Sequence, residues 1–310
     1  MPSWSGILNE LNENRTFDIP PDFDGIRRKY LAALHQHTKR NVILYASGWL
    51  QETAAPSEHL SIGDEDIQAL MEVTYGLSGD TLDLILHSPG GSPEAAEAVV
   101  SYLRARFSHI RVIVPHLAMS AACMIACAAD EIVLGKHSFL GPTDPQIIIP
   151  TPLGSRLVPA QAILDQFERA KEEASDPGKL SAWLPMLQQY GPDLLVQCQS
   201  ALDMSETLIE SWLENYMFKE TSDRSEKAKK AAAWFANHKA FKSHSRHISR
   251  DILIEAGLGL KTTKLETDQE LQDLALSVFH VAMHTFGATD ATKIVENHMG
   301  RAFIKQFRQM

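Results

Sequence analysis

Two stretches of the sequence decide the fold, LDLILHSPGG at residues 82–91 and RVIVPHLAMSAAC at residues 111–123. In each stretch a short apolar run, typical of a buried strand, passes directly into a turn of small residues. The first turn contains Gly90 and Gly91, and the second contains Ser120. Open α/β sheets place their functional sites at the carboxyl ends of such strands. We therefore expect a site that combines backbone N–H groups with a hydroxyl, as acyl-transfer chemistry requires.

The alternation of strand, turn and helix extends on both sides of these stretches. Pro93 suits the first turn of a helix, because a proline there leaves no N–H unpaired. The pattern predicts an α/β fold with a largely parallel sheet covered by helices. Strands are predicted at residues 41–47, 82–86, 111–115 and 131–134, and helices at about 93–107 and from Ser120 to about Ala129.

Shifts in composition divide the chain into four parts. We expect a helical lead-in over residues 1–40, the α/β core over 41–160, a helical insertion over 161–242, and a return to the sheet with terminal helices over 243–310. Five prolines within residues 142–160 predict an extended or looping segment at the end of the core. Breaks in the helical insertion are expected near residues 176–178 and 191–192, where Pro and Gly adjoin.

The composition is typical of a soluble globular protein with a substantial core. Of the 310 residues, 44% are hydrophobic and 22% are charged. A net charge of -10 argues against a general nucleic-acid binder, which normally carries a basic excess. The three cysteines, Cys123, Cys127 and Cys198, are too few and too badly spaced for a disulfide framework or a zinc site.

The sequence also argues against secretion and against a membrane span. No run approaches the roughly 18 apolar residues that a span needs. The first residues lack the basic and apolar regions of a signal peptide, so we expect a cytoplasmic protein. No phosphate-binding loop for ATP is found, and any energy-dependent unfolding of a substrate would therefore need a separate partner.

The chemistry of the two turns centres on Ser120. A serine hydroxyl is a poor nucleophile until it is positioned and relieved of its proton. Ser120 would begin a helix of small residues, where a substrate can approach closely and negative charge is favoured. The N–H groups of Gly91 and Ala121 could then point at one developing oxyanion. The alternative is structural: Ser120 caps the helix, and the Pro-Gly-Gly segment is a tight turn.

The two turns together resemble the ClpP/crotonase superfamily, in which SPGG precedes a helix, a strand and a small-residue turn with serine. Two later segments, AADEIV at 128–133 and SFLGPTDPQ at 138–146, look like the serine dehydrogenase proteinase (SDH) family, a relative of the SppA-type signal peptide peptidases. The resemblance covers nearly the whole chain. Further similar segments are residues 41–50, 247–258 and 293–301.

This resemblance implies a spiral of ββα units with a largely parallel sheet and an added helical segment. It implies a homo-oligomer, such as a trimer, a hexamer or a ring, formed through the helical part. It also implies a serine peptidase that acts on peptides or proteins without a metal or organic cofactor. By matching position, Ser120 would be the nucleophile, and Gly91 and Ala121 would supply the oxyanion hole.

The sequence leaves open which group accepts the serine proton. In ClpP a histidine follows the nucleophile helix, but its place near Thr143 or Asp144 holds no histidine here. SppA-like relatives use a lysine, and the corresponding stretch offers Lys171. Asp144 is the first candidate because a carboxylate with a raised pKa can act as a base, although between two prolines it could simply hold a turn. The other candidates are His137, Lys136, Lys171, His116, His244 and His247.

Several of these residues have a structural interpretation as well. His116 would pack near the strand end, and Lys136 and His137 would be solvated at a turn. Residues 243–247 would form an exposed loop before a helix started by Ser249. Outside the candidates, His280 and His284 would lie on a partly buried helix surface, and Glu296-Asn297-His298 would be an oligomer contact or a fold lock.

Three hypotheses of function follow from these observations. The first is a serine peptidase that forms an acyl-enzyme on Ser120. The second is a crotonase-like enzyme that uses the same hole to stabilise the enolate of an acyl-CoA thioester, and its activity would survive Ser120→Ala. The third is a non-enzymatic interaction protein that keeps the fold but has lost the base.

Overall fold

The computed structural model describes residues 2–13, 20–52, 54–151 and 154–308. Its centre is a seven-stranded sheet in the order β10-β5-β3-β2-β1-β11-β12. The strands from β10 to β1 are parallel, whereas β11 and β12 are added antiparallel at one edge. The predicted α/β fold with a largely parallel sheet is therefore confirmed. The strand bounds are β1 Asn41–Ser47, β2 Thr81–His87, β3 His109–Val114, β5 Glu131–Leu134, β10 Thr262–Lys264, β11 Ala291–Asn297 and β12 Ala302–Gln306.

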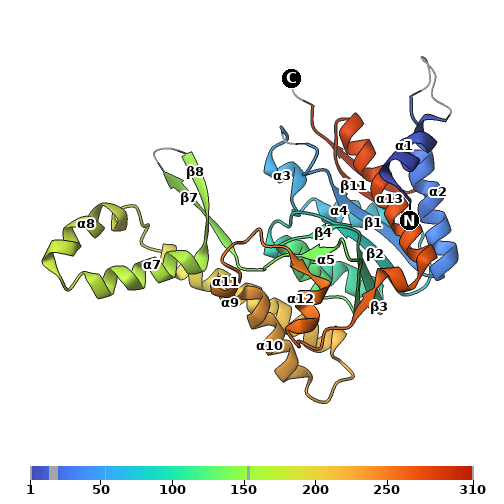
Figure 1. Cartoon of the computed structure of the whole chain (residues 1–310). Coiled ribbons are helices and arrows are strands. Elements are labelled where there is room, and N and C mark those ends of the chain that lie inside the picture. Colours follow the sequence, from blue (N-terminus) through green and yellow to red (C-terminus); the bar gives the residue numbers. More distant parts are fainter. Residues whose placement is uncertain (1, 14–19, 53, 152–153, 309–310) are drawn as a thin grey trace.

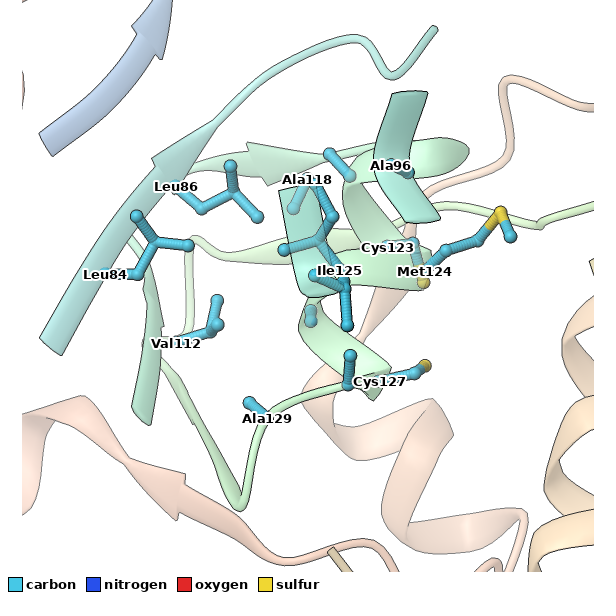
Figure 2. Close-up of a cluster of buried hydrophobic side chains, with 14 of the residues drawn as sticks. Leu84, Leu86, Ala96, Val112, Ala118, Cys123, Met124, Ile125, Cys127 and Ala129 are labelled. Atoms are coloured by element: carbon cyan, nitrogen blue, oxygen red, sulfur yellow. The ribbon is translucent and has the colours of Figure 1, made fainter. Parts of the chain in front are cut away.

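Helices cover both faces of this sheet because successive strand residues point to opposite faces. Ile85 of β2 packs on the face covered by α2 and α13, which lie side by side (Figure 1). Leu84 and Leu86 pack on the other face, where they point toward Ile125 of α6 (Figure 2). The helices of these two layers are α2 Phe23–Thr38, α13 Gln269–Ala288, α4 Asp66–Thr74, α5 Pro93–Arg106, α6 Ala121–Cys127, α9 Leu194–Trp212 and α10 Arg224–Ala236.

A second, small sheet lies at the carboxyl end of the main strands. Its order is β4-β6-β9, and the strands are β4 Leu117–Ala118, β6 Phe139–Leu140 and β9 Ile248–Ser249. The pairing of β4 with β6 is parallel, and the pairing of β6 with β9 is antiparallel. This sheet therefore places the chain after residue 243 beside β6, which in turn pairs with β4, the segment that leads to Ser120.

An arm projects from the body of the molecule (Figure 1). It starts with a hairpin of β7 Gln146–Thr151 and β8 Gly154–Pro159, where the sequence predicted only an extended or looping segment. Helices α7 Ala160–Glu173 and α8 Pro177–Leu187 follow, and α9 returns to the body. The gaps between these helices fall close to the predicted breaks. Pro152 and residue 153 lie outside the described residues.

The remaining elements close the ends of the fold. The predicted lead-in contains α1 Trp4–Asn12 and α2, and its residues 1 and 14–19 lie outside the described residues. On α13, His280 and His284 pack against Trp4 as a helix surface. The short elements are α3 Ser57–Leu60, a π-helix Leu213–Met217, α11 His238–Phe241, α12 Arg250–Glu255 and a 3-10 turn Leu265–Thr267. Among the described residues, no helix is both long and apolar enough to cross a membrane.

The Glu296-Asn297-His298 segment connects β11 to helices of the same chain through buried hydrogen bonds. Glu296 is buried and accepts hydrogen bonds from the guanidinium groups of Arg27 and Arg28 on α2. Asn297 donates to the carbonyl of Val73 at 2.6 Å. These contacts tie β11 both to α2 and to the end of α4.

Candidate active site

The two predicted turns lie side by side. Ser88 N donates to the Leu117 carbonyl at 3.1 Å, and the Ser88 carbonyl accepts from Met119 N at 3.0 Å. A Cβ added to Gly90 would lie 2.6 Å from the Cβ of Ser120 and 2.7 Å from the Met119 carbonyl oxygen. Gly90 also has a φ of +100°, which side chains rarely allow. Glycine is therefore required at this position for the turns to touch.

Gly91 forms a parallel β-bridge with Ile62. Ile62 N donates to the Gly90 carbonyl at 2.8 Å, and the Ile62 carbonyl accepts from Ser92 N at 3.1 Å. The Gly90 carbonyl and the Gly91 N–H belong to the same trans peptide and point in opposite directions. The Gly91 N–H therefore faces away from Ile62, to the β3 side, on which the Ser120 turn follows. It has no hydrogen-bond acceptor in the described part of the chain.

Ser120 has a backbone conformation that side chains disfavour. Its φ is 51° and its ψ is -122°, a combination normally taken by glycine in a type II′ turn. Ser120 occupies the N-cap position of α6, but its hydroxyl makes no capping hydrogen bond to the helix, so a side-chain cap does not account for this residue. Met124 N donates to the Ser120 carbonyl at 3.1 Å as the helix begins, and the Ala121 N–H is left without a described acceptor.

Asp144 is buried and is bound by two imidazoles. Its carboxylate oxygens lie 2.7 Å from His238 Nδ1 and 2.9 Å from His244 Nδ1. The prediction of an exposed loop over residues 243–247 is therefore wrong for His244. A buried carboxylate must be paired, and this pairing draws the loop inward.

The small sheet places the segment that leads to Asp144 beside the segment that leads to Ser120. Gly141 N donates to the Ala118 carbonyl at 3.1 Å, and an added Cβ on Gly141 would lie 3.0 Å from the Cα of Met119. Ser120 follows two residues after Ala118, and Asp144 three residues after Gly141.

The other candidate bases have different surroundings. Lys171 is exposed on the arm and pairs with Glu168 of its own helix at 2.8 Å. Lys136 is exposed, as expected, whereas His137 is half-buried, and burial lowers its pKa. His116 packs against Phe279, and burial lowers its pKa too. Within the described part of the chain, no hydrogen bond or ion pair joins any of these four to Asp144 or Ser120.

Sequence reasoning missed three residues of this region. Gly90 stands beside the predicted Gly91 but makes the closer contact with the serine turn. His238 carries no local signal, since its partner Asp144 lies 94 residues earlier. His87 ends β2 and accepts from Leu117 N at 3.3 Å, and burial lowers its pKa to about 3. The position of this histidine at the end of a largely apolar strand, TLDLILH, was the hint that the sequence offered.

Residues 60–182 match a family model described as ClpP-like SDH-type serine proteinase. Over this segment, which is less than half of the chain, the protein is similar to that family. The SDH-type segment contains Gly91, Ser120 and Asp144 but ends before His238 and His244. The largely parallel sheet and its helices are consistent with a ClpP-like α/β fold.

Two curated relatives match a similar share of the chain. Both are uncharacterized proteins of Methanocaldococcus jannaschii. One is 41% identical over 95 residues, which are 31% of this chain and 30% of the relative. The other is 48% identical over 84 residues, which are 27% of this chain and 29% of the relative. The matched part thus spans less than a third of either relative.

Proposed function

We propose that this protein is a serine peptidase that hydrolyses peptide bonds through an acyl-enzyme on Ser120. The observation that carries the proposal is the pair of open N–H groups, on Gly91 and Ala121, beside a serine hydroxyl that does not cap its helix. Backbone N–H groups without a protein acceptor are the donors that stabilise an oxyanion in acyl transfer. The match of residues 60–182 to the SDH-type serine proteinases supports the same chemistry.

The proton of Ser120 goes to an imidazole, and Asp144 orients that imidazole. Both histidines contact Asp144 through Nδ1, which leaves Nε2 to face a nucleophile, as in Ser-His-Asp sites. Strand register favours His244. Ile248 pairs with Leu140 in the antiparallel β6–β9 ladder. His244 lies four residues before Ile248, and Asp144 lies four residues after Leu140, so the same register sets the two opposite each other. Asp144, the base expected from the sequence, thus becomes the orienting carboxylate.

The reaction then follows from these groups. Ser120 Oγ attacks the peptide carbonyl as His244 takes its proton, and the oxyanion accepts from the N–H groups of Gly91 and Ala121. His244 returns the proton to the leaving amine as the C–N bond breaks. Water, deprotonated by the same imidazole, hydrolyses the ester.

We further propose that the chain acts as a homo-oligomer that uses the arm. The β7–β8 hairpin is two-stranded, and such a hairpin is marginally stable alone. Ile148 and Leu157 form a cross-strand pair on it, yet both are about two-thirds exposed, at 65% and 64%. Covering this pair with another copy would remove apolar surface from water.

Labelling with a fluorophosphonate probe tests the catalytic proposal. Wild type should be labelled on Ser120, and Ser120→Ala should not be labelled. Asp144→Asn and His244→Gln should slow labelling by about 10²–10⁴-fold, the usual contribution of a general base. His247→Gln is the matched control, because His247 is exposed and packs on the Phe139 ring.

Each outcome separates the competing functions. A wild type that resists the probe would refute the peptidase. Labelling that persists in Ser120→Ala would show that another serine reacts. Slowing by His238→Gln in place of His244→Gln would refute the assignment of the base. Turnover of an acyl-CoA that survives Ser120→Ala would favour the crotonase-like chemistry.

A further inference from the structure

A buried ion pair contacts the loop that flanks the Gly90-Gly91 turn, and neither of its residues is one of the proposed catalytic groups. Lys293 of β11 and Asp66 at the start of α4 are both fully buried, and Lys293 Nζ lies 2.7 Å from Asp66 Oδ1. Tyr45 of β1 donates its hydroxyl to Asp66 Oδ2 at 2.7 Å. Ion pairs inside a protein are costly to desolvate and are often no more stabilising than apolar residues of similar volume. Stability alone therefore does not explain why Lys293 and Asp66 are paired in the interior.

This cluster holds the loop that contains Ile62. Lys293 Nζ donates to the Ser61 carbonyl at 2.8 Å, immediately before Ile62. Asp66 Oδ2 accepts from Gly63 N at 3.0 Å, immediately after it. Both neighbours of Ile62 are thus fixed by one ion pair.

Ile62 in turn sets the orientation of the Gly91 peptide. Its N–H and carbonyl bind the residues on either side of Gly91, at 2.8 Å and 3.1 Å. An added Cβ on Gly91 would lie only 2.3 Å from the Ile62 carbonyl oxygen, so the two backbones are in direct contact. A shift of Ile62 would therefore turn the Gly91 N–H.

We propose that Asp66 and Lys293 are positioning residues, which clamp Ile62 so that the Gly91 N–H stays aimed at the oxyanion formed on Ser120. The proposal rests on the proposed function, because it gives the buried pair a role only if Gly91 is an oxyanion donor. The pair contacts neither the nucleophile nor the base, so its effect is confined to stabilising the oxyanion.

Two reactions at residue 120 isolate that effect. Reaction of Ser120 with a fluorophosphonate builds negative charge on a phosphonyl oxygen and uses the hole. Alkylation of the thiol in a Ser120→Cys background by iodoacetamide proceeds at a saturated carbon and forms no oxyanion. The three native cysteines are buried, and peptide mass mapping locates the label.

The test variant is Asp66→Asn with Lys293→Met, which removes both charges together. Its matched control is Arg27→Met with Glu296→Gln, which removes another fully buried pair that also ends on β11 but does not contact the Ile62 loop. Tyr45→Phe is a milder variant that removes one hydrogen bond to Asp66, and it carries the test if the double variant does not fold.

Loss of one oxyanion donor costs about 10²–10³-fold in rate. We expect the test variant to slow phosphonylation at least tenfold relative to the control, and Tyr45→Phe to slow it less, with alkylation unchanged in both. Equal slowing of both reactions, or unchanged phosphonylation, would overturn the positioning role while the labelled wild type leaves the peptidase intact. A wild type that the probe never labels would overturn both proposals.

Discussion

Replacing Ser120 with glycine should stabilise the folded chain while it abolishes labelling. The φ of 51° and ψ of -122° at Ser120 lie in a region that glycine adopts without strain and other residues do not. Such backbone strain costs about 1–3 kcal/mol. Glycine loses more entropy on folding, which offsets about 0.5–1 kcal/mol of that gain. The expected net gain is about 0.5–2 kcal/mol. For a chain of this size it corresponds to a Tm higher by roughly 1–4 °C.

Ser120→Ala is the proper reference for this experiment. Alanine also removes the hydroxyl but keeps the Cβ, and therefore the strain. The measurement is the free energy of unfolding of the two variants, from chemical denaturation at neutral pH, with Tm as a second reading. If Ser120→Gly is no more stable than Ser120→Ala, then Ser120 is not strained, and the view that this turn is held open for catalysis fails.

Three further perturbations test other parts of the structure. Gly90→Ala should abolish labelling of Ser120, because its methyl group would meet the serine turn at 2.6 Å, whereas nearby Gly63→Ala, whose added Cβ meets nothing within 4 Å, should label normally. His87 has a folded pKa of about 3 against 6.5 unfolded, so the unfolded chain binds more protons as pH falls. Stability should therefore decline below pH 6.5 by about 1.4 kcal/mol per pH unit, and His87→Gln should remove that share of the slope in denaturation curves. Ile148→Ser with Leu157→Ser should reduce the mass found by analytical ultracentrifugation if the arm joins copies, and an unchanged mass would contradict that role.

The sheet could be predicted because its signals are local. The four parallel strands that were predicted, β1, β2, β3 and β5, are short and largely apolar runs followed by turns, and burial on both faces makes such runs stand out. The parallel strand β10, with the sequence TTK, carries no such signal. The hairpin at residues 146–159 was missed for the opposite reason. Its prolines suggested irregular chain, but Pro150 and Pro159 are accommodated in a two-stranded ribbon with open edges.

The partners of Asp144 could not be predicted, because they depend on tertiary structure. His238 lies near the end of the helical insertion over residues 161–242 and His244 follows just after it, and nothing near them in the sequence points back to Asp144. The strand register that sets His244 opposite Asp144 arises from β9, a strand of only two residues. Sequence reasoning therefore found the nucleophile turn, the Asp144 carboxylate and His244 as one of several candidate bases, but it did not pair His244 with Asp144 and it missed His238.

The features around Ser120 are each unfavourable for folding, and this makes their coincidence informative. A strained serine, a glycine that permits no side chain, and two N–H groups with no acceptor among the described residues all reduce stability when taken alone. A sequence selected only for stability would place glycine at residue 120 and pair the open amides. Local rules are broken together mainly where function requires it. The structural interpretation of this turn thus leaves unexplained the same features that acyl transfer requires.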